Sequence, residues 1–395
     1  MKQLIVIVLM LLLHGCNVIK IISISSKQEK NIKTSVPQKF NISEDNKILI
    51  KIDINGFFHK MYFDTRAPSI IFRQKGSWTD TLPEIATPKI LQPKVAGGQQ
   101  INRNFIKLRN AECELFSIKN WVISGIENNW VCNKAIGIIG HEEFSIGNKD
   151  ERKILKLDFD RQELTFIKNV PAEWFRVKTK FRLGYITIFL KINGIEYPFG
   201  LDTGLGCAII FSKKNMDDNI DTITNKNILY GKIFQVAGGG IISDTIEIKK
   251  ANKIFLTDSF SVSDAEIMIA PKNMGNLVGI DLMKYYNWIF DYKSKNVYIQ
   301  PIALSTFENE HFFRCFLGAT FDVSTIPITV STMVIDGKAE KAGLMLNDKI
   351  LSVNQFNILN IPVCERKNKI KEILRNESEI IFTIQRNGET KKIKL

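Results

Sequence analysis

The sequence predicts a mainly β protein in which one domain occurs twice, and three observations carry this prediction. Short stretches recur in the same order at an almost constant offset along the chain. Apolar and polar residues alternate with a period of two in both copies, as expected of half-buried strands. An Asn-Gly pair, a strong short-range signal for a β-hairpin, follows each alternating run.

Four ordered matches define the repeat, at offsets between 138 and 141 residues. Each match joins a stretch of the first copy to its counterpart in the second: Ile54-Asn55-Gly56 with Ile192-Asn193-Gly194, Phe63-Asp64-Thr65 with Leu201-Asp202-Thr203, Val95-Ala96-Gly97-Gly98 with Val236-Ala237-Gly238-Gly239, and Ile138-Ile139-Gly140 with Leu277-Val278-Gly279. We therefore expect two copies of one domain, over about residues 46–168 and 181–301.

The composition is that of an ordinary globular protein. The chain has 395 residues, 45 % hydrophobic and 24 % charged, which excludes a disordered or fibrous chain and allows two or three domains. The formal net charge is +13, but the basic residues are spread evenly, so nucleic acid is not an expected partner. Four scattered histidines and the absence of paired-cysteine spacing argue against a zinc site, and no metal or cofactor is implied.

The N-terminus is predicted to be an export signal. Lys2 precedes an apolar run over residues 4–13, which is too short to span a membrane as a helix. The following His14-Gly15-Cys16 resembles the lipobox of bacterial lipoproteins. That resemblance implies removal of residues 1–15, lipidation of Cys16, and a cell-envelope protein anchored by lipid to a bacterial membrane, periplasmic or surface-facing. The alternative is a secretory signal with a chance cysteine. Residues 16–45 are expected to form a polar tether.

The Asp-Thr loops point to a known family. A strand, a hairpin, a second strand and then Asp202-Thr203-Gly204 resemble the catalytic loop of aspartic proteases of the retropepsin and pepsin type. The Ala-Gly-Gly turns resemble the tip of a flap hairpin, formed by Gly97 and Gly98 in one copy and Gly238 and Gly239 in the other. The apolar-apolar-Gly matches resemble the strand that threads beneath the loop. The resemblance covers residues 46–301 and implies two pseudo-symmetric retropepsin-like β-barrel lobes in a bilobal fold.

The resemblance also implies a site and a reaction. Asp64 and Asp202 would meet between the lobes, share one proton and activate a water molecule that attacks a peptide bond. Thr65 and Thr203 would tie the two loops together, and Gly204 would let the backbone pass close to the carboxylates. The expected substrates are peptides or unfolded proteins. Because both copies lie in one chain, a monomer suffices; a homodimer pairing two second copies is the alternative.

The first copy departs from the family pattern, because Arg66 stands where a glycine is expected. A guanidinium that reaches the two aspartates would favour their doubly ionised state and depress both pKa values. A guanidinium that points outward would leave catalysis intact. A third alternative is a catalytically inactive protein that keeps the cleft and acts as a peptide-binding or scaffolding lipoprotein.

Residues 314–395 change in character. Ala342-Gly343-Leu344 and the following Asp348-Lys349-Ile350 resemble the bacterial PDZ signature. Leu317, Gly318 and Ala319 stand where that family has its carboxylate-binding loop, which implies capture of peptide or protein termini by β-augmentation. The alternative is a small domain that packs on the rest of the chain without a ligand.

Three further residues carry minor expectations. Cys113 and Cys132 lie in one copy and are a candidate disulfide pair in an oxidising compartment. His141 is expected at the surface and has no assigned role.

Overall fold

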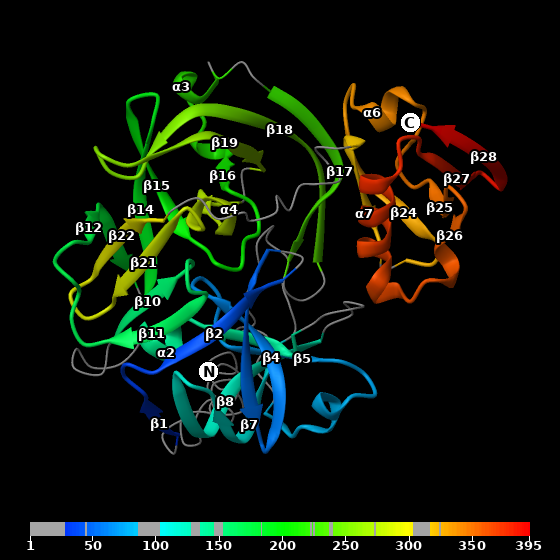
Figure 1. Ribbon diagram of the computed structural model, residues 1–395. Helices are drawn as coiled ribbons and strands as arrows, with labels where there is room; N and C mark the ends of the chain where they lie inside the picture. The colour runs from blue at the N-terminus through cyan, green and yellow to red at the C-terminus, as the bar shows by residue number, and fades with distance from the viewer. Residues whose placement is uncertain are drawn as a thin grey trace, which may run out of the picture.

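The protein is mainly β, as the alternating pattern predicts. The computed structural model describes residues 28–43, 46–85, 103–127, 135–145, 153–182, 184–221, 223, 226–236, 240–271, 274–302, 317–323 and 325–395. Within these ranges, the strands assemble into two 14-stranded sheets. Figure 1 shows the first copy in blue to cyan, the second in green to yellow, and the C-terminal segment in orange to red beside the second copy.

Two strands of the second copy complete the first sheet, and its other twelve strands come from the first copy and the segments around it. They are β1 (Glu29–Ile32), β2 (Pro37–Ile42), β3 (Ile48–Ile54), β4 (Phe57–Asp64), β5 (Ile70–Arg73), β6 (Glu84–Ile85), β7 (Arg103–Glu112), β8 (Phe116–Glu127), β9 (Gly137–Gly140), β10 (Ile154–Asp158), β11 (Glu163–Ile167) and β12 (Phe175–Val177), with the short helices η1 (Trp78–Thr81) and α2 (Glu142–Ser145).

The second copy has the same kinds of elements. They are β13 (Thr179–Arg182), β14 (Tyr185–Ile192), β15 (Ile195–Leu201), β16 (Ile209–Ser212), β17 (Lys226–Val236), β18 (Gly240–Phe255), β19 (Ser261–Ala270), β20 (Leu277–Val278), β21 (Tyr286–Asp291) and β22 (Asn296–Pro301), with helices η3 (Lys213–Asn215), α3 (Asp218–Asp221) and α4 (Ile280–Met283).

The two copies repeat one pattern of strand pairing. β4 pairs in parallel with β9 as β15 does with β20, and β5 pairs in parallel with β8 as β16 does with β19. Each threading strand also pairs antiparallel with the strand after the Asp-Thr loop, β9 with β5 and β20 with β16. The copies join through β10 and β21, whose antiparallel pairing places Leu157 opposite Trp288.

The threading strands pass so close to the loops that only glycine fits. A Cβ added to Gly140 would lie 2.3 Å from the carbonyl oxygen of Ala67, and one added to Gly279 would lie 2.2 Å from that of Cys207. These distances are far below any real contact, and the neighbours are backbone atoms that cannot move aside cheaply. The apolar-apolar-Gly signature thus has a steric cause in both copies.

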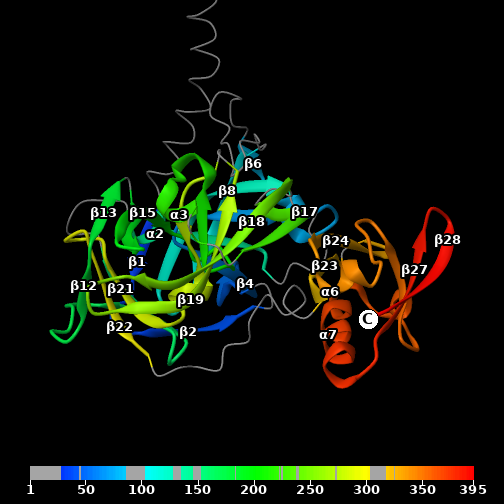
Figure 2. The same ribbon diagram turned by 90° about the horizontal axis from the view of Figure 1, so that it is seen from above.

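One apolar core runs through both copies, with Trp121 and Trp288 among its largest fully buried side chains. The C-terminal module, residues 317–395, has a separate core. Its elements are β23 (Ala319–Asp322), β24 (Ile328–Val334), β25 (Lys349–Val353), β26 (Phe356–Asn357), β27 (Ile381–Arg386) and β28 (Glu389–Lys394), with helices α6 (Lys338–Lys341), η4 (Ile358–Asn360), η5 (Val363–Glu365) and α7 (Arg366–Asn376). Figure 2 shows this module from above, with α7 next to the strands.

The polar tether expected over residues 16–45 is wrong for its C-terminal part. β1 pairs with β8, and β2 pairs with both β3 and β11. β2 alternates exposed and buried positions, and Phe40 reaches the main core. The many polar residues of this segment are the outward half of an alternating strand. No helix in the described part of the chain is long and apolar enough to cross a membrane.

Candidate active site

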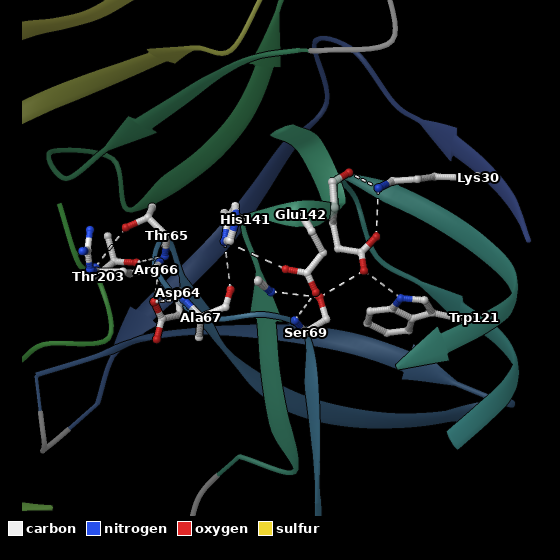
Figure 3. A network of polar contacts seen from close by, with 12 residues as sticks. Lys30, Asp64, Thr65, Arg66, Ala67, Ser69, Trp121, His141, Glu142 and Thr203 are labelled. Carbon is white, nitrogen blue, oxygen red and sulfur yellow. Dashed lines mark hydrogen bonds and ion pairs between the residues drawn. The ribbon is translucent and has the colours of Figure 1, made fainter. Parts of the chain in front are cut away.

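The two Asp-Thr loops meet through their threonines. The Thr65 hydroxyl donates to the carbonyl oxygen of Leu201 (3.1 Å) and accepts from the backbone N–H of Thr203 (3.2 Å). The Thr203 hydroxyl donates to the carbonyl oxygen of Phe63 (3.0 Å) and accepts from the N–H of Thr65 (3.0 Å). Both threonines are fully buried. Figure 3 shows Thr203 against the loop of Asp64 and Thr65. The threonine exchange, as we call these four bonds, fixes one copy against the other.

The threonine exchange brings the two aspartates to one point. A Cβ added to Gly204 would lie 2.1 Å from Asp64 Oδ2 and 3.2 Å from Asp202 Oδ1, so both carboxyl oxygens lie within a few ångströms of the same position. Any side chain at Gly204 would displace the Asp64 carboxylate. The glycine of the second Asp-Thr-Gly triplet is therefore a steric requirement of the pair.

Backbone donors hold both carboxylates. Asp64 Oδ1 accepts from the N–H groups of Arg66 (2.7 Å) and Ala67 (3.0 Å). Asp202 Oδ1 accepts from the N–H of Gly204 (3.0 Å). One oxygen of each carboxyl is thus held by its own loop, which leaves the other for a proton or a ligand.

Burial keeps a proton on the pair. Burial first, and then the negative charge of Asp64, raise the pKa of Asp202 to about 7, although Arg66, the Gly204 N–H and Lys47 act in the opposite direction. Burial also raises the pKa of Asp64, against the lowering effects of its two backbone bonds, Lys47 and His141. The closeness of the two carboxyls and their shielding from solvent therefore disfavour ionisation of both below about pH 7.

Arg66 reaches across into the second copy. A Cβ added to Gly200 would lie 2.0 Å from Arg66 Nη1, so the guanidinium fills the space left by this glycine. Its Cζ atom lies 5.7 Å from the ring centre of Tyr185, within cation–π range. The guanidinium lowers the pKa of Asp202, but burial and the charge of Asp64 outweigh it. The depression of both pKa values, expected for a guanidinium near the pair, does not occur.

A second cation, Lys47, also acts on the pair. Lys47 Nζ lies 5.1 Å from the ring centre of Tyr62 and lowers the pKa of both aspartates. Tyr62 and Gly200 hold equivalent places, since they pair with Ile138 and Leu277 on the two threading strands. The site thus has two cations, each of which lies over a tyrosine. Sequence reasoning missed Lys47 because its position before β3 carries no recognisable pattern.

His141 is buried, not at the surface as expected. Its Nδ1 lies 3.1 Å from the carbonyl oxygen of Ala67, whose N–H holds Asp64. Its ring packs on Tyr185 with centroids 4.4 Å apart. The histidine therefore contacts the backbone of the Asp64 loop and packs on Tyr185, the ring that Arg66 also contacts.

Two glutamates, the partly buried Glu142 and the buried Glu143, continue this support. Glu142 accepts from the backbone N–H of Ser69, and burial and the adjacent Glu143 raise the pKa of Glu142 to about 7. Glu143 accepts from Trp121 Nε1 (2.8 Å) and the Ser69 hydroxyl (3.0 Å), and Lys30 of β1 pairs with it at 2.8 Å. Figure 3 shows Lys30 and Trp121 converging on this point. The network ties strand β1 to the segment that follows Asp64.

Several predicted residues lie outside the described part of the chain. They are Cys16, Cys132 and the four flap glycines, Gly97, Gly98, Gly238 and Gly239. β17 and β18 do form an antiparallel hairpin that leads to the second of these turns, with Val236 opposite Gly240. Cys113 is a buried free thiol whose pKa burial raises to about 11, so the candidate disulfide with Cys132 is wrong. Among the described residues, no acidic, histidine or cysteine cluster is arranged to hold a metal.

The loop predicted to bind carboxylates precedes β23. Leu317 and Ala319 are fully buried, while Gly318 takes a left-handed φ of 73°. A Cβ on Gly318 would lie 3.0 Å from the Cα of Gly337. β23 pairs along one edge with β24, with Ala319 opposite Met333. Gly318 is therefore required by close backbone packing at the start of the module.

Comparison with known proteins gives distant likenesses among solved structures. No family model matches the sequence, and no curated protein matches it. Among solved structures, the chain is similar to basic 7S globulin from soybean, with 8 % sequence identity over 69 % of this chain and 98 % of the globulin and a TM-score of 0.42. A TM-score this low does not assign the fold, so the proposals below rest on contacts within this chain.

We expect the free energy of unfolding to fall as pH rises from about 4 to 7. Over this range the native pair keeps a proton that unfolded aspartic acid, with a pKa of 3.8, has released. The slope is at most about 1.4 kcal/mol per pH unit. The variant Asp202→Asn has no ionisable group at this position and should reduce this slope. The variant Asp258→Asn changes an exposed surface pair and should leave the slope unchanged. Urea unfolding at a series of pH values measures this; equal slopes in both variants would contradict proton sharing.

Proposed function

We propose that the protein is an aspartic endopeptidase, built from two retropepsin-like lobes followed by a PDZ-like domain. The observation that carries the proposal is the threonine exchange, which holds Asp64 and Asp202 at one buried point. A turn or a helix cap explains an isolated Asp-Thr pair, but not two such loops bonded to each other across a repeat. The raised pKa of Asp202, to about 7, is what a shared proton requires.

The reaction needs one ionised and one protonated carboxyl. The ionised member takes a proton from a water molecule between the two, and the water oxygen attacks the carbonyl carbon of the scissile peptide bond. The protonated member donates its proton to the carbonyl oxygen. The resulting tetrahedral species breaks its C–N bond, and the leaving nitrogen takes up a proton from the pair. One hydroxyl of the tetrahedral carbon returns its proton to the pair as the C=O bond re-forms. No covalent intermediate forms, and the chain needs no cofactor for this step. One chain supplies both carboxyls, so we propose a monomer.

The C-terminal module is proposed to bind peptide or protein termini. Successive backbone N–H groups around Leu317, Gly318 and Ala319 would hold a terminal carboxylate, and an extended chain would pair with β23. β23 is paired with β24 along one edge in the described residues, which supports addition of a strand at the other.

Peptide hydrolysis tests the proposed reaction. We expect a purified chain to cleave a peptide library between acid and neutral pH, and Asp64→Asn and Asp202→Asn each to lower the rate by about 10²- to 10⁴-fold, because each removes the proton donor or acceptor. The matched control is Asp258→Asn, which changes an exposed residue in a surface ion pair with Lys191. Activity that survives in Asp202→Ala, or that a chelator abolishes while pepstatin-like inhibitors have no effect, contradicts the mechanism.

The second candidate is a pseudoprotease that binds or scaffolds peptides, and Arg66 is the observation that favours it. The variant Arg66→Gly separates the two. In a working enzyme, loss of the guanidinium should raise the pKa of Asp202 and move the alkaline limb of the pH–rate profile to higher pH, because Arg66 lowers that pKa. A pseudoprotease should instead be inactive as found and show hydrolysis only in the variant. The measurement is kcat/KM across pH for both chains.

We propose that the protein is held at a bacterial membrane by a lipid on Cys16, with residues 1–15 removed. The support is the apolar run before His14-Gly15-Cys16. Cys16→Ser should abolish incorporation of labelled fatty acid and release the protein from the membrane fraction. Cys207→Ser, a buried free thiol in the second copy, is the control for loss of a cysteine. Labelling that persists without Cys16 contradicts the anchor.

A further inference from the structure

The C-terminal module is hydrogen-bonded to the hairpin of the second copy. Strand β24 of the module pairs antiparallel with β17, with Leu229 opposite Val334 and Gly231 opposite Thr332. The N–H of Ile335 donates to the carbonyl oxygen of Ile228 (2.9 Å) and extends this pairing. Figures 1 and 2 both show β17 alongside β24. The sheet of the second copy therefore continues into the module without a break.

A glycine makes this pairing close. Gly231 has a φ of 117°, which L side chains rarely adopt. A Cβ at this position would lie 2.3 Å from the carbonyl oxygen of Ser331 and 3.0 Å from the Cα of Thr332. Glycine normally weakens a strand, so its place at the contact point with β24 is explained by the approach of the two backbones.

Two side chains of β17 bond to the module on either side of Gly231. The Tyr230 hydroxyl donates to Glu340 (2.7 Å), and the Tyr230 ring packs on the core of the module. Lys232 Nζ forms an ion pair with Asp322 of β23 (3.1 Å), with the two side chains 37 % and 20 % exposed. The pair is partly shielded from solvent and bridges β17 to β23 of the module. Three consecutive residues of β17 thus carry the contact.

The contact continues inward to the Asp202 loop. Val334 of the module lies in a buried apolar cluster with Leu229 of β17, Ile246 of β18 and Cys207. Leu205, the residue after Gly204, packs against this same cluster. The module, the hairpin and the segment following Asp202 therefore share one packed core, in which a shift of one member is felt by the others.

We propose that the module positions the β17–β18 hairpin beside the active site, and that Tyr230 and Lys232 are positioning residues for substrate binding. The positioning itself stands on the β17–β24 contact, while its effect on hydrolysis rests on the proposed function. A hairpin that is already held in place does not lose conformational entropy when substrate binds. Loosening the hairpin adds this cost to binding, so we expect KM to rise while kcat stays almost unchanged.

Charge reversal in the full chain tests this positioning. Lys232→Asp and Asp322→Lys each place two like charges together, and the double variant restores the pair. We expect each single variant to speed amide exchange of residues 226–234 by about tenfold and to raise KM severalfold, with both values restored in the double variant. Lys191→Asp, opposite the exposed Asp258 at 3.5 Å, is the matched control and should change neither. Tyr230→Phe removes a single hydroxyl and should act in the same direction, about threefold.

Unchanged exchange in both single variants overturns the inference, as does faster exchange with an unchanged KM. If the unaltered chain does not hydrolyse peptides, the proposed function fails, and amide exchange alone decides whether the module positions the hairpin.

Discussion

The threonine exchange is the interaction on which the rest of the site depends. Each hydroxyl both donates and accepts across the axis between the copies, and both side chains are fully buried. A buried hydrogen bond adds only about 1 kcal/mol net, but leaving its partners unsatisfied costs about 1–3 kcal/mol each. Because Asp64 and Asp202 directly precede the two threonines, the same bonds that join the copies set the position of the carboxylates.

The strands of the two copies pair in equivalent ways around the site, whereas its charged side chains do not follow this symmetry. Arg66 and Lys47 each lie over a tyrosine near the aspartates. Arg66 fits because Gly200 leaves room at the position that Tyr62 fills in the other copy. Two cations beside two carboxyls would normally favour full ionisation, yet burial outweighs them and raises the pKa of both aspartates. The departure at Arg66 is therefore compatible with a proton-sharing pair.

The sequence predicts those parts of the fold and the site that depend on residues close together along the chain. The Asp-Thr loops, the Asn-Gly turns and the close-packed glycines Gly140 and Gly279 are local patterns, and the repeat doubled each signal. Lys47, Gly200 and His141 were missed because each acts on a residue from another element. Strands β1 and β2 are not evident from the sequence, because β1 is mostly exposed and the polar residues on the outer face of β2 mask its alternation. Cys113 was paired on spacing alone, which carries no information on geometry.

The pairing of β24 with β17 is of the same non-local kind, because it joins residues about a hundred positions apart. From sequence, Gly231 only weakens a strand; in the fold, it lets another backbone approach. β24 has β23 on one edge and β17 on the other. An extended chain added at β23 would therefore be separated from the hairpin of the second copy by two strands, which corresponds to a distance of about 14 Å. Strand β24 thus links the edge proposed to bind termini to the site proposed to cleave peptides. A ligand that displaces β24 would also shift Leu205, because Val334 of β24 and Leu205 pack in the same cluster.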